Sequence, residues 1–192
     1  GNTEDEDGAI VKDTTKPVIT GSRDPLPNSS GWSNTDVTVT FTCEDVGGDQ
    51  SGIAVNTVEG ATVTTEGKNQ SVTNSGECID KAGNVAEPVT VSGINIDKTA
   101  PVVTISLPKD NRKFKLNEVI SVTWSATDNL SGVNESEYTK KPKKFVLDTK
   151  TTGWKNFSLP SGLVEDEAGN SSEEVTISYE VEDEDGAIVK DT

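Results

Sequence analysis

Two stretches of the chain alternate strictly between apolar and small polar side chains. Residues 37–43 read Val-Thr-Val-Thr-Phe-Thr-Cys, and residues 120–126 read Ile-Ser-Val-Thr-Trp-Ser-Ala. A period of two places every second side chain on one face of a β-strand, so both stretches predict strands with one buried and one exposed face. We find no amphipathic pattern of helical period and useful length, and we therefore predict an all-β protein.

These two strands belong to a longer internal repeat. They lie 83 positions apart, and further segments match in the same order along the chain. Five segments of the first half match segments of the second half: 13–17 matches 97–101, Asp45 matches Asp128, 51–53 matches 131–133, 80–84 matches 166–170, and 89–91 matches 175–177. Because the matches keep their order, we interpret the chain as two homologous modules, at 15–97 and 98–182.

The chain also contains a second repeat, with a longer period than the first. The eleven residues Glu-Asp-Glu-Asp-Gly-Ala-Ile-Val-Lys-Asp-Thr occur at 4–14 and again, unchanged, at 182–192. This favours a longer parent protein with a two-module period of 178 residues, and two similar linkers are the plainer alternative. We interpret 1–14 as an acidic linker or first strand, and 183–192 as the start of the next repeat.

The repeated segment contains short apolar pairs that could form strands. Ile10 and Val11 in the first copy correspond to Ile188 and Val189 in the second. Such a strand could add to the edge of a module in another subunit and build a fibre. The plainer alternative, which we favour, is that the segment enters the next module of the same chain.

Composition agrees with short strands joined by tight turns. Thr, Val and Ile account for 56 of the 192 residues, and these β-branched side chains favour pleated sheets over helices. Glycine-containing turn signals recur through both modules. About seven short strands at this spacing predict a two-sheet sandwich in each module.

The net charge and the residue types that the chain lacks argue against several classes of function. The net charge is −16, which argues against nucleic acid or anionic lipid as a partner. No apolar run approaches the roughly 18 residues that a membrane-spanning helix needs. The chain has no histidine, so the usual general base and the usual zinc ligand are missing. With no recognisable nucleophile–base pair or phosphate loop, we predict that the protein is not an enzyme.

The chain has two cysteines, both in the first module. Cys43 ends an early strand and Cys78 lies on a late one, where an immunoglobulin-type sandwich carries its inter-sheet disulfide. The equivalent positions of the second module hold Ala126 and Val164, so the two positions change together. We favour a disulfide, which suits a secreted β-domain, and two buried free thiols are the alternative.

Several short motifs carry a family resemblance. In the first module they are Gly31-Trp32, 36–43, 51–53, 78–84 and 97–101, and in the second Pro101, Asp128, Ser131-Gly132, 153–157 and 166–170. With these motifs the chain resembles the bacterial Ig-like repeats of large extracellular and cell-surface proteins. The resemblance implies two tandem immunoglobulin-like β-sandwiches, used as a stalk, spacer or adhesin segment, and it carries over no catalytic residue. The second module lacks cysteines, so we expect it to rely on packing around Trp124 and Trp154.

The Asp-x-Ala-Gly-Asn turns at 80–84 and 166–170 have two interpretations. In the interpretation we favour, these motifs form hydrogen-bonded turns, in which the aspartate accepts backbone N–H groups and the glycine adopts positive φ. In the other, side-chain oxygens bind calcium, the one cofactor that the sequence suggests. The candidate ligands are Asp45, Asp49, Asp80 and Asn84 in the first module, and Asp128, Asp166 and Asn170 in the second.

Two further surface features have weak functional interpretations. The Asn-x-Ser/Thr sequons are candidate glycosylation sites, at Asn28, Asn69, Asn129, Asn134, Asn156 and Asn170. The three tryptophans could form a sugar-binding platform. Trp124 lies in the apolar phase of its strand and is expected in the core, and we expect Trp32 and Trp154 to be packing caps.

We therefore predict a non-catalytic structural repeat of a secreted surface protein, acting as a semi-rigid stalk, spacer or fibre segment. Its expected partners are neighbouring repeats of the same protein and, by strand addition, other copies of it. The alternative is an adhesive or carbohydrate-binding Ig-like module that calcium stabilises. We expect neither nucleic-acid binding nor membrane insertion.

Overall fold

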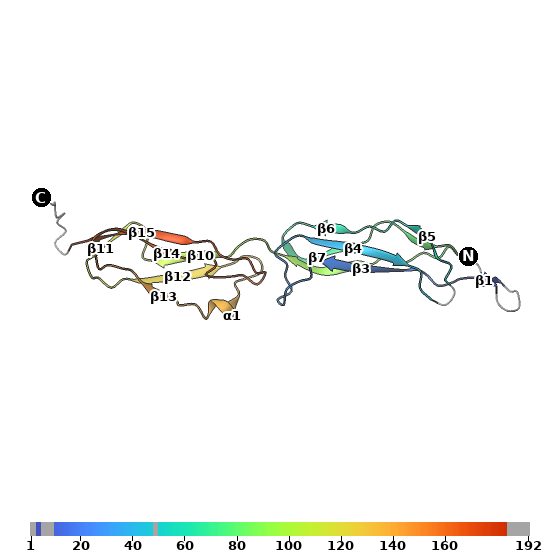
Figure 1. The fold of residues 1–192 in the computed structure, drawn as a ribbon, viewed down its shortest axis with the longest axis horizontal. Helices are drawn as coiled ribbons and strands as arrows, with labels where there is room; N and C mark the ends of the chain where they lie inside the picture. Colours follow the sequence, from blue (N-terminus) through green and yellow to red (C-terminus); the bar gives the residue numbers. More distant parts are fainter. Residues whose placement is uncertain (1–2, 5–9, 48–49, 184–192) are drawn as a thin grey trace. The chain divides into compact units, whose positions relative to one another are not determined.

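The computed structural model describes residues 3–4, 10–47 and 50–183. The chain divides into two compact units, Gly1–Asp97 and Lys98–Thr192, which we call unit one and unit two (Figure 1). Within the described residues both units consist of β-strands, and unit two adds one short helix. The predicted all-β class is confirmed. We describe each unit by itself.

Unit one is built around an eight-residue strand with alternating burial. Its strands are β1 (Thr3–Glu4), β2 (Ile10–Val11), β3 (Val18–Asp24), β4 (Val37–Glu44), β5 (Ile53–Asn56), β6 (Ala61–Val63), β7 (Gly67–Thr73), β8 (Cys78–Asp80) and β9 (Thr90–Ile96). Strand β4 lies between β3 and β6, and β5 pairs with β8 and β7 with β9, all antiparallel. The apolar side chains of β4 are buried and its threonines are exposed, as the period-two pattern predicts. They form the core of this unit together with Ile19, Cys78, Ile94 and Ile96.

Unit two repeats this arrangement around its own alternating strand. Its elements are β10 (Val102–Leu107), β11 (Arg112–Lys115), β12 (Ser121–Thr127), α1 (Glu135–Tyr138), β13 (Lys144–Val146), β14 (Gly153–Leu159) and β15 (Val175–Glu182). Strand β12 lies between β10 and β13, and β15 lies between β11 and β14 (Figure 1). The β11–β15 pair is parallel, and the other pairs in this unit are antiparallel.

The two central strands have corresponding neighbours. In unit one Val39 of β4 pairs with Ala61 of β6, and in unit two the matching Val122 of β12 pairs with Phe145 of β13. Strand β6 is therefore the counterpart of β13. The two units differ between these points, where unit two inserts α1, a four-residue helix with no buried side chain.

The core of unit two is rich in large side chains. Trp124 is 6% exposed, meets the Tyr138 ring edge-on at 5.4 Å between centroids, and donates its indole N–H to the Pro142 carbonyl at 2.9 Å. Val164 is buried and Ala126 packs against the same core, in the places that cysteines occupy in unit one. Trp154 is 61% exposed, so the expectation that it packs into this unit is wrong.

Candidate functional site

Three carboxylates converge at one end of the β3–β4 pair in unit one. Asp13 precedes β3, Asp45 directly follows β4, and Asp80 ends β8. One oxygen from each lies within 4.8 Å of the others. Asp13 and Asp80 are each 1% exposed. We call these three residues the unit-one triad.

Backbone and amide donors hold the triad in place. Asp13 accepts the N–H groups of Thr15 at 2.9 Å and of Ser51 at 3.0 Å, one on each oxygen. Asp80 accepts the backbone N–H of Asn84 at 2.8 Å and its side-chain N–H at 2.6 Å. The same Asn84 amide donates to the Asp13 carbonyl at 3.1 Å and so ties the two aspartates together.

Hydrogen bonds lower the pKa of two of these carboxyl groups. The N–H of Thr15 is the largest influence on the Asp13 carboxyl, and it lowers the pKa against the opposing effect of burial. At Asp80 burial is the largest influence and would raise the pKa, but the two bonds from Asn84 outweigh it and the pKa is lowered. The nearby charge of Asp13 also pushes the pKa of Asp80 upward, as a like charge does.

One triad oxygen has no partner. Asp45 accepts the N–H of Gly52 at 2.6 Å through Oδ2, whereas its Oδ1 is buried without a hydrogen bond. No lysine or arginine of the described part of the chain forms an ion pair with the three carboxylates. Three like charges with one unsatisfied buried oxygen form a donor set of the kind that calcium binds.

Unit two repeats two of these carboxylates. Oxygens of Asp128 and Asp166 also lie within 4.8 Å of each other. Asp128 accepts the N–H groups of Leu130 and Gly132, and Asp166 accepts both N–H groups of Asn170, as in unit one.

The structure rearranges the predicted calcium ligands. It brings Asp45 together with Asp80, and Asp128 together with Asp166, and it adds Asp13 to the first pair, which the sequence analysis missed. The signal for Asp13 was the Asp-x-Thr-x-Pro segment at 13–17, which was noticed only as part of a repeat.

The two asparagines of this region have a different role from the predicted one. The amide nitrogens of Asn84 and Asn170, and not their oxygens, face the aspartates, so both asparagines position carboxylates as the turn interpretation expects. Gly83 and Gly169 have positive φ, also as that interpretation expects. Asp49 lies outside the described residues.

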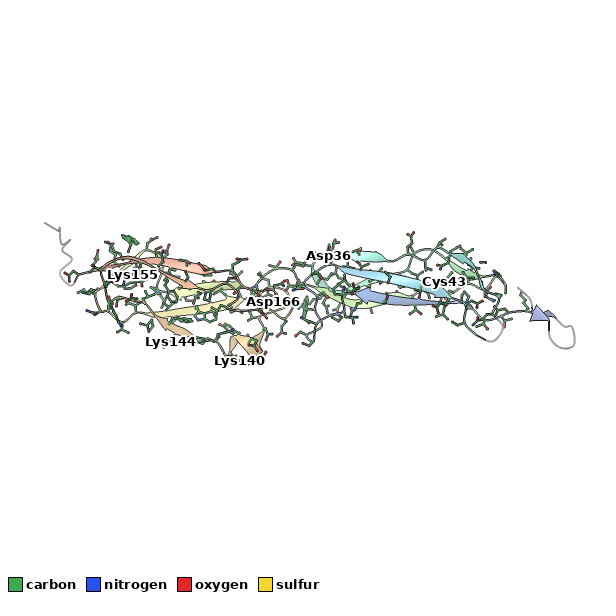
Figure 2. The ribbon with its side chains drawn as sticks, in the orientation of Figure 1. Asp36, Cys43, Lys140, Lys144, Lys155 and Asp166 are labelled. Carbon is green, nitrogen blue, oxygen red and sulfur yellow. A yellow bond between two sulfur atoms is a disulfide. The ribbon has the colours of Figure 1, made fainter. Side chains whose placement is uncertain are left out.

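The predicted disulfide is present in unit one. Cys43 of β4 is joined to Cys78 of β8, with 5.8 Å between their Cα atoms (Figure 2 labels Cys43). Both cysteines belong to the buried core of the unit. The bridge closes a loop across a sequence separation of 35 residues and fastens the strand that leads to Asp45 to the strand that ends at Asp80.

The sequons differ in how well they suit a glycan. Asn28, Asn69, Asn129 and Asn156 are exposed, whereas Asn134 and Asn170 are half-buried. Asn134 caps α1 by accepting the N–H of Glu137. The Asn170 amide nitrogen donates to both Asp166 and Thr99, so a glycan there would replace one of these hydrogen bonds.

The strand-exchange residues are only partly described. The backbone of Ile10 and Val11 pairs antiparallel with Thr3 and Glu4 of the same chain, and Ile188 and Val189 lie outside the described residues. Among the described residues, no helix has the length and apolar character needed to cross a membrane.

A comparison with known proteins finds a family match within the second unit. Residues 101–177 match the family model of the bacterial Ig domain, which confirms for the second module the resemblance seen in the sequence. One solved structure, of fibronectin(III)-like modules of CbhA from Clostridium thermocellum, is similar with 13% identity over 90% of this chain and 100% of that chain, at a TM-score of 0.36. No curated protein matches the chain.

Proposed function

We propose that this chain is a non-catalytic structural segment of an extracellular protein, made of two tandem Ig-like sandwiches that act as a semi-rigid spacer. The bacterial Ig match over 101–177 carries the proposal. Unit one supports it, because β3–β4–β6 repeats the strand order of β10–β12–β13. A disulfide in unit one is in keeping with an oxidising compartment outside the cytosol.

Small-angle X-ray scattering on the full chain tests the spacer. We expect an extended particle whose maximum dimension stays constant with salt. The matched control inserts a flexible Gly-Ser stretch between Asp97 and Lys98, at the boundary of the two units, and should broaden the distribution of dimensions. A compact particle, or a control that scatters like the parent chain, would contradict a semi-rigid spacer.

A second candidate function, calcium-dependent stabilisation, rests on the unit-one triad. Asp13, Asp45 and Asp80 would hold the ion, with Asn84 keeping Asp80 in position and Ser51 and Thr15 keeping Asp13 in position. A bound divalent cation would neutralise three mutually repelling carboxylates and satisfy the free oxygen of Asp45.

The direction in which one substitution changes the melting temperature, with and without calcium, tests this second candidate function. Without calcium, Asp45→Asn removes a like charge from the triad and should raise the melting temperature of unit one. With calcium, the same change removes a ligand and should lower it relative to the parent chain. Glu44→Gln, at the exposed neighbouring position, is the matched control and should do neither. A change of the same sign with EDTA and with calcium would rule out the calcium site.

A further inference from the structure

Lysines are concentrated in one short stretch of this acidic chain. Residues 140–155 contain six lysines and a single acidic residue, Asp148, so the stretch carries +5 in a chain of net charge −16. Four of the six lie in 140–144, which follows α1 and ends on the first residue of β13. One of them, Lys140, forms an ion pair with Glu137 of α1 at 2.8 Å. Lys140 and Lys144 are exposed on the same side of unit two in Figure 2, and Lys155 lies on the other side.

The strand beside these lysines is an edge strand. β13 pairs with β12 on one side and ends the sheet order β10–β12–β13 within the described residues. The N–H of Leu147 donates to the Ile120 carbonyl at 3.0 Å. Because backbone groups alternate in direction along an antiparallel strand, those of Lys144 and Val146 point away from β12. An open edge of this kind can accept a further strand.

Apolar side chains lie next to this open edge. Val146 is 61% exposed and Val119 is 78% exposed. Both line a hollow of about 180 Å³ formed by 117–119 and 146–150. The surface therefore combines free backbone groups, exposed valines and a positive flank. We call it the β13 edge.

Unit one shows that the fold does not require these lysines. Its counterpart strand β6 is also the last strand of its sheet within the described residues, in the order β3–β4–β6. The stretch around it, 57–67, contains Glu59 and Glu66 and no lysine. The stretch 57–67 is therefore acidic, whereas the stretch 140–155 is basic.

We propose that the β13 edge binds the acidic segment 183–189 of a second copy of this chain by strand addition. The segment reads Asp-Glu-Asp-Gly-Ala-Ile-Val, so its acidic start can lie beside the lysines while one of Ile188 and Val189, which alternate in direction along a strand, covers the exposed valines. Its first copy is less suited as a donor, because β2 there already pairs with β1 in the same chain. The proposal rests on the proposed function as a repeating structural segment and names the contact through which copies would associate.

Binding of a labelled peptide tests this contact. The peptide of residues 183–192 is titrated into the full chain and followed by fluorescence anisotropy, with a scrambled peptide of the same composition beside it. Two amides report directly: those of Lys144 and Val146, which point outward, should gain protection from hydrogen exchange when the native peptide binds. This readout does not depend on any substitution.

Two pairs of variants separate charge from strand pairing. Lys141→Glu with Lys144→Glu should weaken binding at least about tenfold, whereas Lys109→Glu with Lys115→Glu makes the same change of charge elsewhere in unit two and should leave binding within about twofold. Val146→Pro removes an outward N–H and should abolish binding, whereas Thr62→Pro on β6 should not.

The outcomes are distinct. Equal binding of the scrambled peptide, equal loss in both lysine pairs, or unchanged exchange at Lys144 and Val146 would each overturn strand addition at this edge. The scattering experiment on the full chain is extrapolated to zero protein concentration, where contacts between copies make no contribution. Failure of the peptide to bind would overturn the contact alone, whereas a compact particle in the scattering experiment would overturn the spacer function.

Discussion

Removing the Cys43–Cys78 bridge should destabilise unit one and leave unit two unchanged. Reduction is the cleanest perturbation, because both sulfur atoms stay in the core and only the crosslink is lost. The double variant Cys43→Ala with Cys78→Val is the second perturbation, since it installs the residues that unit two carries at Ala126 and Val164.

The expected loss follows from the size of the closed loop. With a sequence separation of 35 between the cysteines, the chain-entropy relation gives a loss of about 4 kcal/mol at room temperature. For a unit of this size that corresponds to a melting temperature lower by about 15–30 °C. A domain of ordinary stability has only about 5–15 kcal/mol in total, so a loss of this size is a large share of the stability of unit one.

Calorimetry of the full chain with and without a thiol reductant measures this loss. Hydrogen exchange followed by mass spectrometry assigns each unfolding transition to a unit. Each transition is then fitted separately as a two-state transition. If reduction lowers the free energy of unfolding of unit one by less than about 1 kcal/mol, the crosslink does not restrict the unfolded chain as supposed. An equal shift of unit two, which has no cysteine, would show that the two units do not unfold independently.

Three further substitutions test the packing and the triad. Asn84→Ala should cost unit one about 1.5–3 kcal/mol by chemical denaturation. The pKa of Asp80 is lowered in the fold, so its contribution to stability is present above its ordinary pKa near 3.8 and is lost as the pH falls through the folded value. The variant lacks the Asn84 hydrogen bonds that lower this pKa, so in an acid titration its smaller stability should fall less steeply with pH than that of the parent chain. Gly60→Ala places a Cβ 1.8 Å from a backbone carbonyl of β4 and should cost about 2–4 kcal/mol, against about 1 kcal/mol for Gly83→Ala, which has positive φ but open space. Trp124→Phe should cost unit two about 2–3 kcal/mol in a urea melt, through a lost indole hydrogen bond and a cavity.

The features that the sequence predicts well are those fixed by strand periodicity. Val37, Val39 and Phe41 are buried because a half-buried strand leaves no other face for them, and the same reasoning places Trp124 in the core. Trp154 could have been predicted correctly in the same way. Lys155, Phe157 and Leu159 form the inward phase of β14, which leaves Trp154 in the outward phase.

The triad could not be assembled from periodicity. Its residues come from a segment before β3, the end of β4 and the end of β8, and only the topology of the unit brings these three points together. The turn motif revealed Asp80, because Asp-x-Ala-Gly-Asn has a local hydrogen-bonding logic. Asp13 also has a local hydrogen bond, from the N–H of Thr15, but its second carboxylate oxygen is satisfied by Ser51, which is 38 positions away.

The two units reach a stable core by different means. In unit one the buried apolar side chains are mostly Val and Ile, with Phe41 and Trp32 as the large members, and the disulfide lies among them. Unit two buries Trp124, Tyr179, Leu147 and Leu159 and has small apolar residues where the cysteines would be. Large side chains bury more apolar area each, so unit two has less need of a crosslink. Reduction should therefore separate the two units in stability, although they share one strand order around their central strands.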